Sequence, residues 1–353
     1  MNNQQSLLQW YLLNKRDLPW RNTQNPYLIW LSEIILQQTR VAQGLPYFLK
    51  FAQKYPQIES LARAPEDEVL KLWQGLGYYS RGRNMLKTAQ FIVEHLQGQF
   101  PNSYAELIKL KGIGPYTAAA IASFAFNEAV AVLDGNVFRV LSRFFAISDS
   151  IDSVSGKKLF SALANDFLNK SNPALHNQAI MELGALICTP QNPSCAICPL
   201  QTNCLAFVQG NPNQFPVKSK KVQTKKRYIA YFHFNYNGKI AVFKRPPGGI
   251  WHALYDLPYL ESDEPLQKKD WFSQALNKNW LEPKQTLDLI FEKKHILTHQ
   301  HIYAQFYRVN LTQIPHLQFN ETWLNPSELS KLGVSRLLDL YLQKNQAEPI
   351  HLL

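Results

Sequence analysis

The sequence predicts a protein with two domains, an all-α region followed by a smaller α+β domain. The chain has 353 residues, which is more than one ordinary domain needs. Apolar residues recur at intervals of three and four up to about residue 205, whereas from about residue 227 they alternate with a period of two. A stretch with few apolar residues separates the two patterns. We therefore expect an all-α region at 1–210, a basic linker at 211–227 and a second domain at 228–345.

Helices are expected where the intervals of three and four are clearest. Turns that contain Gly and Pro separate these segments, which are 27–51, 103–110, 117–126 and 137–145. One such turn lies in LKGIGPYT, at 110–117. Gly112 and Gly114 allow a tight turn, and Pro115 suits the first turn of the next helix, whose free amides can bind a phosphate. We therefore expect a helix-hairpin-helix at about 103–126.

All four cysteines of the chain lie within seventeen positions, in a C-x6-C-x2-C-x5-C pattern formed by Cys188, Cys195, Cys198 and Cys204. Four thiolates at this spacing can hold a cubane iron–sulfur cluster, a zinc ion, or pair as two disulfides. Zinc sites more often combine two C-x2-C knuckles, and disulfides are uncommon in a chain without a secretory signal. The spacing thus favours a metal module at about 188–204, with an iron–sulfur cluster ahead of zinc.

The second domain is expected to contain a β-hairpin near its start. Asn237-Gly238 lies between two alternating runs, and this dipeptide is a strong signal for a two-residue turn. The expected strands are 227–236, 239–244, 286–292 and 302–311, and the expected helices are 270–278 and 335–344. These elements together predict an α+β fold.

The charge of the chain favours a polyanionic partner. The net charge is +11, from 37 Lys and Arg against 26 Asp and Glu, and a basic surplus of this size suits phosphate neutralisation. The run 218–227 carries six of these cations and either lies on phosphates or is a solvated spacer.

The N-terminus does not resemble a signal peptide, and the longest apolar run, 118–126, is far short of a membrane span. We expect a cytoplasmic, nucleoid-associated protein that does not bind membranes.

Several motifs make the chain resemble the adenine DNA glycosylases of the MutY family, in the helix-hairpin-helix superfamily of endonuclease III. The resemblance covers nearly the whole chain. It is carried by the cysteine spacing and by LPWR at 18–21, SEIILQQTRV at 32–41, GLGYYSR at 75–81, LKGIGPYTAAAI at 110–121, LDGNVFRVLSR at 133–143 and NQAIMELGALICTP at 177–190. It implies an all-α helix-hairpin-helix glycosylase core with a [4Fe-4S] cluster loop, followed by a C-terminal Nudix-like domain that reads the opposite base.

The resemblance also implies a reaction. Such enzymes are monofunctional glycosylases of base excision repair, which hydrolyse the N-glycosidic bond of adenine mispaired with 8-oxoguanine or guanine in double-stranded DNA. The target base must first be flipped out of the stack. We therefore expect a monomer that acts on duplex DNA containing an adenine mispair.

Glu33 matches the acid of the family, which protonates the departing adenine. Its neighbours at helical spacing include Ile29, Trp30 and Leu36, and apolar surroundings raise a carboxyl pKa because they disfavour the charged form. The alternative is an ordinary glutamate on a helix surface. The match to SEI-x-LQQT favours the catalytic interpretation.

Two further residues match catalytic positions of the family. Asp134 corresponds to the carboxylate that stabilises the electron-poor sugar, although Asp-Gly-Asn is also a common turn or helix N-cap. Tyr116 stands where lyases of the superfamily carry a lysine, and a phenol cannot form an imine. The resemblance therefore implies hydrolysis without a β-lyase step; packing as a buried aromatic is the alternative for Tyr116.

Other residues match the family's DNA contacts. The adenine pocket corresponds to Arg16, Trp20, Arg21, Leu36 and Gln178. Contacts to DNA and to the opposite base correspond to Gln38, Thr39, Leu76, Tyr78, Gly112, Gly114, Thr298 and His299. Wedge residues of this apolar or aromatic kind are expected where a base is pushed out. Core packing is the alternative for Trp20, Leu36 and Leu76.

The match in the second domain is looser. Leu297-Thr298-His299 corresponds to a Phe-Ser-His loop, so the hydroxyl is kept while the aromatic ring is replaced by Leu297, whose role the resemblance does not define. An ordinary hairpin turn is the alternative.

Three rival functions fit the sequence less well. A Nudix hydrolase needs a glutamate-rich helix for divalent metal, but Leu254 and Tyr255 occupy the position of its first glutamate. An endonuclease III-like glycosylase-lyase is disfavoured by Tyr116 and by the long C-terminal domain. A non-catalytic iron–sulfur DNA-binding protein would not need the two carboxylates or Gln178.

Overall fold

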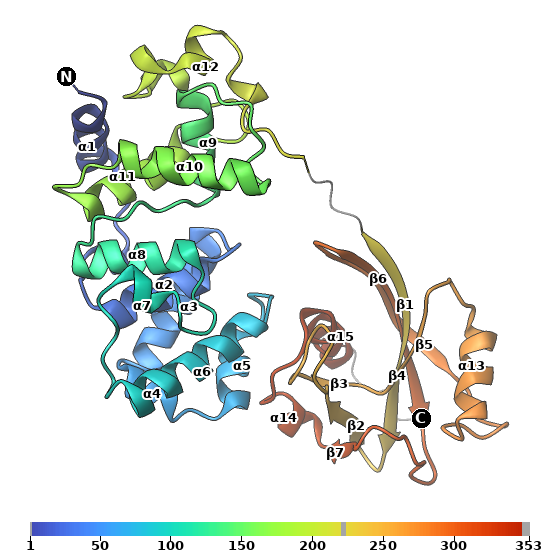
Figure 1. Ribbon diagram of the computed structural model, residues 1–353. Coiled ribbons are helices and arrows are strands. Elements are labelled where there is room, and N and C mark those ends of the chain that lie inside the picture. Colours follow the sequence, from blue (N-terminus) through green and yellow to red (C-terminus); the bar gives the residue numbers. More distant parts are fainter. Residues whose placement is uncertain (1, 220–223, 348–353) are drawn as a thin grey trace. The chain divides into compact units, whose positions relative to one another are not determined.

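The computed structural model describes residues 2–219 and 224–347, and this part of the chain divides into two compact units (Figure 1). The first unit contains the residues up to Arg63 and those from Asn84 to 219. The second contains Ala64–Arg83 together with the residues from 224 onward. Periodicity places 64–83 in the helical region, whereas its contacts group it with the C-terminal residues.

The regular secondary structure in the described part of the first unit consists of helices and short 3-10 turns. The expected helix at 27–51 is two helices, because the chain turns at 37–40 and Gln38 adopts a left-handed backbone with a φ of 57°. The helices are α1 Asn3–Asn14, α2 Pro26–Leu36, α3 Val41–Lys54, α4 Ile58–Ala62, α7 Tyr104–Leu107, α8 Pro115–Phe126, α9 Gly135–Phe144, α10 Val154–Phe167, α11 Pro173–Leu186, α12 Leu205–Val208 and most of α6 Ser80–His95. The short 3-10 turns are η1 Pro19–Arg21, η2 Cys195–Ile197, η3 Gln201–Asn203 and η4 Pro212–Gln214.

Local signals explain where several of these helices begin. Asn25 accepts hydrogen bonds from the Tyr27 and Leu28 amides and so caps α2, while Pro26 occupies its first turn. Ser153 caps α10 in the same way, by accepting from the Gly156 amide. These caps satisfy amides that would otherwise lack a partner at a helix start.

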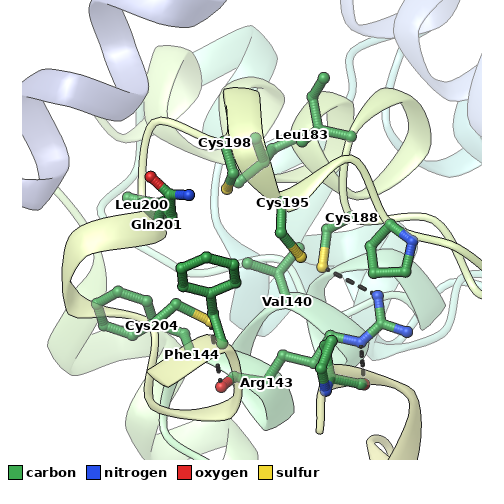
Figure 2. A pocket seen from close by; sticks show the side chains of 14 residues that line it. Val140, Arg143, Phe144, Leu183, Cys188, Cys195, Cys198, Leu200, Gln201 and Cys204 are labelled. Atoms are coloured by element: carbon green, nitrogen blue, oxygen red, sulfur yellow. Dashed lines mark hydrogen bonds between the residues drawn. The ribbon is translucent and has the colours of Figure 1, made fainter. Parts of the chain in front are cut away.

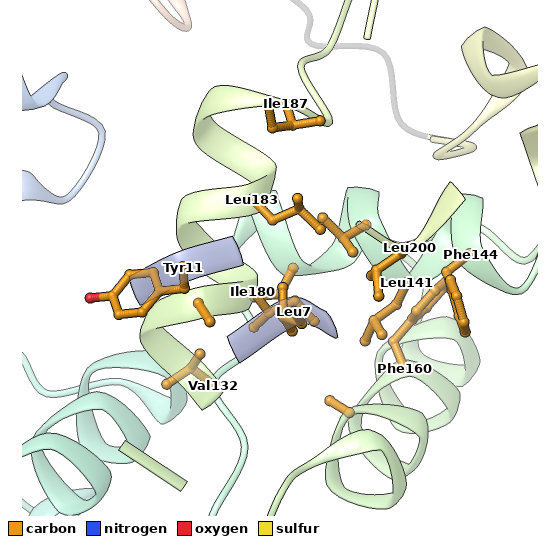
Figure 3. Close-up of a cluster of buried hydrophobic side chains, with 14 of the residues drawn as sticks. Leu7, Tyr11, Val132, Leu141, Phe144, Phe160, Ile180, Leu183, Ile187 and Leu200 are labelled. Atoms are coloured by element: carbon orange, nitrogen blue, oxygen red, sulfur yellow. The ribbon is translucent and has the colours of Figure 1, made fainter. Parts of the chain in front are cut away.

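A buried apolar core holds α1, α9, α10 and α11 together (Figure 3). Leu7 and Tyr11 of α1 pack with Leu141, Phe160 and Ile180, all of them almost fully buried. Truncating a buried ring such as that of Phe160 to Ala costs about 3–5 kcal/mol of stability. The core therefore fixes α9 and α11 relative to each other, and both helices contribute to the pocket described below.

The second unit is built around a sheet with the strand order β3-β2-β1-β6-β5. The central strands β1 and β6 are parallel, from Lys225 opposite Gln300 to Asn235 opposite Asn310, and β4 and β7 add to β1 and β2. The strands are β1 Lys225–Tyr236, β2 Lys239–Lys244, β3 Tyr255–Asp256, β4 Tyr259–Ser262, β5 Asp288–Leu297, β6 Gln300–Asn310 and β7 Thr322–Leu324. The helices are α5 Glu66–Trp73, α13 Lys268–Asn277, α14 Pro326–Leu329 and α15 Arg336–Ala347.

The expected hairpin is confirmed. β1 and β2 are antiparallel with Tyr236 opposite Lys239, and the turn residues Asn237 and Gly238 have φ values of 50° and 75°. Two consecutive left-handed residues define the turn that matches the twist of the strands, and Asn-Gly is the dipeptide that tolerates it best. The four expected strands and two expected helices are all present, although β5 extends further than 286–292.

Only part of the expected linker is separate from the helical unit. The Arg143 Nε donates to the Pro212 carbonyl at 2.8 Å, the Ile151 amide donates to the Val217 carbonyl at 3.1 Å, and the Ser219 amide donates to Asp152 at 3.0 Å. The chain up to 219 is therefore packed on the first unit. Residues 220–223 of the basic run lie outside the described residues.

Among the described helices, no segment is both long enough and apolar enough to cross a membrane.

Candidate active site

The first unit contains a pocket of about 610 Å³ that brings together residues far apart in the sequence. It collects all the residues expected to be catalytic or to line the adenine pocket: Arg16, Trp20, Arg21, Glu33, Leu36, Tyr116, Asp134 and Gln178. Thr39, which is expected to contact the opposite base, lines the same pocket. Three helices (α2, α8 and α11), the 3-10 turn η1 and the neighbouring loops supply these side chains, with Asp134 at the N-cap of α9. The pocket therefore exists only once the helical unit has folded.

Glu33 lies on α2 inside this pocket and is only 6% exposed, which excludes the alternative of a surface glutamate. Burial raises the pKa of its carboxyl from 4.5 to about 7. A hydrogen bond of 2.5 Å from the Tyr116 hydroxyl opposes this rise, and the negative charge of Asp134 adds to it. Glu33 is thus a carboxyl that holds its proton to about neutral pH, as a general acid requires.

Asp134 is the N-cap of α9 and faces the same pocket. Its carboxylate accepts hydrogen bonds from the Val137 amide at 2.8 Å and from the Asn136 side-chain amide at 2.7 Å. Burial raises the pKa of Asp134, while these hydrogen bonds oppose the rise, and the start of a helix favours a negative charge. The N-cap interpretation therefore holds, and it is compatible with a carboxylate that faces a cationic group in the pocket.

Tyr116 is the second residue of α8 and its hydroxyl is directed at Glu33. Burial and the nearby carboxyls of Glu33 and Asp134 raise its pKa well above the ordinary value for a phenol. The hydroxyl is therefore a neutral donor that fixes the orientation of the Glu33 carboxyl. It contributes no amine to the pocket.

Glu182 is a pocket residue that the sequence analysis missed. Its side chain is fully buried and forms ion pairs with Arg16 and Arg21, each at 2.6 Å. Burial alone would raise the pKa of Glu182, but the hydrogen bonds from the two arginines outweigh it and hold the pKa at about 2. The signal that could have revealed Glu182 is its position four residues after Gln178, on the same face of α11.

The remaining expected pocket residues combine lining and packing roles. The Tyr11 hydroxyl donates to Gln178 Oε1 at 2.7 Å, which leaves the Gln178 NH2 group as the donor end of this side chain. The Trp20 ring is 8% exposed and packs edge-on against Phe48 at 5.0 Å, so the core alternative also applies to it. Leu36 is half-buried at the pocket wall.

The hairpin before α8 has the backbone that its glycines predict. Gly112 has a φ of 78°, and a Cβ at this position would lie 2.9 Å from the Asn84 Cβ. Gly114 caps α8 and Pro115 occupies its first turn, as expected. The Thr88 hydroxyl donates to the Lys111 carbonyl at 2.5 Å and anchors the hairpin to α6. The turn before the first amides of α8 therefore requires glycine at position 112. Gly114 has an extended backbone, with a φ of −90°, that any residue can adopt.

The four cysteines line a single small cavity in the first unit (Figure 2). All four cysteines are free thiols in this structure. Arg143 is fully buried beside them, and its Nη1 donates to Cys188 Sγ at 3.3 Å and to the Thr189 carbonyl at 2.7 Å.

The donor set of this cavity consists of thiols. Within residues 2–219 and 224–347, no three His, Cys, Asp or Glu side chains form a site for a single metal ion. A cubane iron–sulfur cluster takes four cysteine ligands. Four thiols around one cavity without ligands of another type fit such a cluster.

A second pocket, of about 550 Å³, lies within the second unit. It contains four of the residues expected to contact the opposite base: Leu76, Tyr78, Thr298 and His299. Thr298 and His299 form the turn between β5 and β6, and the Tyr78 and Thr298 hydroxyls share a hydrogen bond of 2.5 Å. Leu297 also lines this pocket. Thr298 is therefore in a hairpin turn, as the alternative held, and in a pocket.

The other two opposite-base candidates belong to the first unit. Gln38 is exposed in the turn between α2 and α3, and Thr39 lines the pocket of Glu33. The structure therefore divides the expected opposite-base set between the two units. Leu76 is only 6% exposed, which agrees with a packing role as well.

Comparisons with known proteins give consistent matches. A family model described as "HhH-GPD superfamily base excision DNA repair protein" matches residues 31–165, and one described as "NUDIX domain" matches residues 230–344. Adenine DNA glycosylase of Buchnera aphidicola subsp. Baizongia pistaciae is 38% identical over 343 residues, which cover 94% of this chain and 93% of the relative. The Homo sapiens adenine DNA glycosylase is 33% identical, with 94% of this chain and 71% of the relative covered.

Solved structures resemble the helical part. A thermostable thymine-DNA glycosylase is 28% identical with a TM-score of 0.54, covering 58% of this chain and 95% of that one. Endonuclease III in a non-covalent complex with DNA has a TM-score of 0.50 and 22% identity, covering 60% of this chain and 98% of that one. At 22% identity, the similarity to endonuclease III shows a shared fold only.

Proposed function

The chain belongs to the adenine DNA glycosylase family, and we propose that it hydrolyses the N-glycosidic bond of adenine mispaired with 8-oxoguanine or guanine in double-stranded DNA. Its DNA partner follows from the family and agrees with a net charge of +11. We propose further that it acts as a monomer on one mispair at a time.

The acid in this reaction is Glu33. Adenine leaves poorly as an anion, so a proton on the ring must accompany cleavage of the bond to the sugar. A carboxyl with a pKa of about 7 is partly protonated near neutral pH and can donate that proton. The hydrogen bond from Tyr116 orients the Glu33 carboxyl, so that the donated proton leaves from a defined position.

Asp134 serves the other half of the reaction. Departure of the base leaves a sugar with cationic character, which an ionised carboxylate stabilises electrostatically or by forming a bond, as in glycosidases. The hydrogen bonds from Val137 and Asn136 favour the ionised form of Asp134 and hold it in place. Water then completes hydrolysis, and because Tyr116 offers no amine, no β-lyase step follows.

The flipped adenine enters the pocket beside Glu33. Its volume of about 610 Å³ accommodates a purine nucleoside, and flipping costs about a few kcal/mol of stacking and pairing. The Gln178 NH2 group can donate to a ring nitrogen of the base, and the side chains of Trp20 and Leu36 form an apolar part of the pocket wall. Glu182 holds Arg16 and Arg21 at this wall, where they add hydrogen-bond donors near the base.

The opposite base is read by two sets of residues. Thr298, with His299 beside it, offers a hydroxyl to oxidised guanine, and Leu76 and Tyr78 line the same pocket as the expected wedge. Gln38 and Thr39 of the first unit are the second set. The hairpin with Gly112 and Gly114 binds a backbone phosphate through the first amides of α8.

The four cysteines hold a [4Fe-4S] cluster in this proposal. Cys188, Cys195, Cys198 and Cys204 would be its ligands, and the group would supply structural order to the loop at 188–204. Arg143 already ties this loop to α9, the helix that starts at Asp134, through its contacts to Cys188 and Thr189.

The observation that carries the proposal is the buried Glu33 carboxyl, with its raised pKa, in a nucleoside-sized pocket shared with Asp134. The test is a glycosylase assay on duplexes in which adenine faces 8-oxoguanine, guanine or thymine. We expect adenine release from the first two, and strand breaks only after alkali. Equal release from all three would contradict the proposed reading of the opposite base, and breaks without alkali would indicate a lyase.

A further inference from the structure

The loop at 74–79, between α5 and α6 in the second unit, has an unusual backbone. Gly75, Gly77 and Tyr78 all have left-handed φ values, of 100°, 72° and 45°. Glycine accepts such values without strain, but a tyrosine does not. A residue in this conformation persists only where the surrounding structure holds it. The contacts at the two ends of the loop therefore decide whether Leu76 and Tyr78 keep their positions.

Gln74 holds the start of the loop. Its Oε1 accepts from the Val334 amide at 3.2 Å, and its Nε2 donates to Asp339 Oδ1 at 3.0 Å. Lys71 also donates to this Oε1, at 3.4 Å. One side-chain amide therefore connects the loop to two residues that lie about 260 positions later in the sequence.

Tyr79 holds the end of the loop at the same place. Its hydroxyl donates to the Val334 carbonyl at 3.2 Å and accepts from the Gly75 amide at 3.3 Å. Val334 is 2% exposed and forms a bridge with Tyr255 of β3. Both peptide groups of this buried residue are thus used to anchor the loop to the sheet.

The residues between these anchors are the ones that line the second pocket. Leu76 and Tyr78 line this pocket together with Thr298, and the Tyr78 hydroxyl is hydrogen-bonded to the Thr298 hydroxyl. We propose that Gln74 is a positioning residue for opposite-base recognition: its side-chain amide bridges Val334 and Asp339 and so holds Leu76 and Tyr78 against Thr298. This inference rests on the proposed function, because it assigns the pocket to the base opposite adenine.

The partners of Asp339 allow a matched set of variants. Asp339 Oδ2 accepts from Arg336 at 2.5 Å and from Gln343 at 3.1 Å, so its carboxylate is an acceptor on both oxygens. Gln74→Glu keeps an acceptor for the Val334 amide but places a second carboxylate against Asp339. Asp339→Asn keeps an acceptor for the Gln74 amide. In the double variant, the side-chain amide introduced at position 339 can donate to the carboxylate introduced at position 74.

The experiment measures single-turnover adenine release by the full-length protein from duplexes in which adenine faces 8-oxoguanine or guanine. The ratio of the two rates reports opposite-base recognition. We expect Gln74→Glu to lower this ratio about tenfold, the factor that corresponds to loss of a hydrogen bond to a charged group. Asp339→Asn should leave the ratio unchanged, and the double variant should restore it.

Circular dichroism and thermal unfolding establish that each variant is folded. Should Gln74→Glu not fold, Gln74→Met replaces it, since it keeps the length of the side chain, loses both bonds and carries the same expected loss. An unchanged ratio in the folded variant, or a loss that the second substitution does not restore, would overturn the inference. Failure of the unaltered protein to release adenine from either duplex would instead refute the proposed function.

Discussion

Replacing Glu33 by Gln is expected to stabilise the protein, and the gain should grow as the pH rises from 5 to 8. The side-chain amide of the variant would remain neutral at every pH and could still accept the hydrogen bond from Tyr116. The buried carboxyl of the unaltered protein must instead either keep its proton or carry a charge away from water. The difference between the two proteins therefore isolates the free energy of ionising Glu33 in its pocket.

The magnitude follows from two pKa values. In the folded protein the pKa of Glu33, which is 6% exposed, is raised from 4.5 to about 7, chiefly by burial. Between these values the folded state binds more protons than the unfolded state, so rising pH lowers the free energy of unfolding. The loss relative to fully protonated Glu33 is about 0.8 kcal/mol at pH 5 and about 3.3 kcal/mol at pH 8. The advantage of Glu33→Gln should accordingly increase by about 2.5 kcal/mol between these pH values.

The assay is urea unfolding of both proteins at pH 5 and pH 8, followed by circular dichroism of the helical unit. Taking the difference between the proteins at each pH cancels the other titrating groups. An equal difference at both pH values would refute the assignment of a raised pKa to Glu33. It would also remove the physical basis for its role as the acid.

Three further outcomes are expected. The single-turnover rate of adenine release should fall about tenfold per pH unit above about pH 7, because only protonated Glu33 can donate; a flat pH–rate profile would contradict this. Glu182→Leu should cost about 3–5 kcal/mol in the urea assay, because it leaves Arg21, with a side chain only 11% exposed, as an uncompensated charge; a loss under about 1 kcal/mol would count against the buried ion pair. Cys198→Ser should abolish the visible absorbance of the iron–sulfur cluster and lower the iron content of the purified protein, because the cluster loses one ligand. A variant that retains the full absorbance and iron content would contradict the assignment of Cys198 as a ligand.

Local sequence signals predicted much of the fold. The period of three and four and the later period of two correctly separated helices from strands, and the matches at 31–165 and 230–344 confirm the two expected fold types. Pro115 and the Asn237-Gly238 pair marked a helix start and a hairpin turn because each constrains its own backbone. Signals of this kind act within a few residues, and they remain valid whatever packs around them.

The features that the sequence patterns did not predict are contacts between segments far apart in the sequence. Residues 64–83 have helical periodicity like their neighbours, so nothing local indicates that Gln74 and Tyr79 bind Val334 in the second unit. Glu182 escaped notice because a single glutamate on a helix resembles any exposed one until Arg16 and Arg21 are seen around it.

The candidate site was predicted by resemblance rather than by spacing. Glu33, Tyr116 and Asp134 lie on α2, α8 and the start of α9, and no periodicity links residues so far apart. Their meeting in one pocket depends on helix packing, which a single sequence encodes only through the whole core. Local analysis could indicate the apolar neighbours of Glu33 but not the nearby carboxylate of Asp134.

The most direct test of the account compares adenine release by the unaltered protein and by Glu33→Gln under single-turnover conditions, on a duplex with adenine opposite 8-oxoguanine. Binding of the same duplex is measured in parallel, so that loss of chemistry is separated from loss of affinity. We expect the variant to bind the duplex about as tightly and to release adenine at least about a hundredfold more slowly, the contribution typical of a general acid. Release at an undiminished rate by Glu33→Gln would contradict proton donation by this carboxyl.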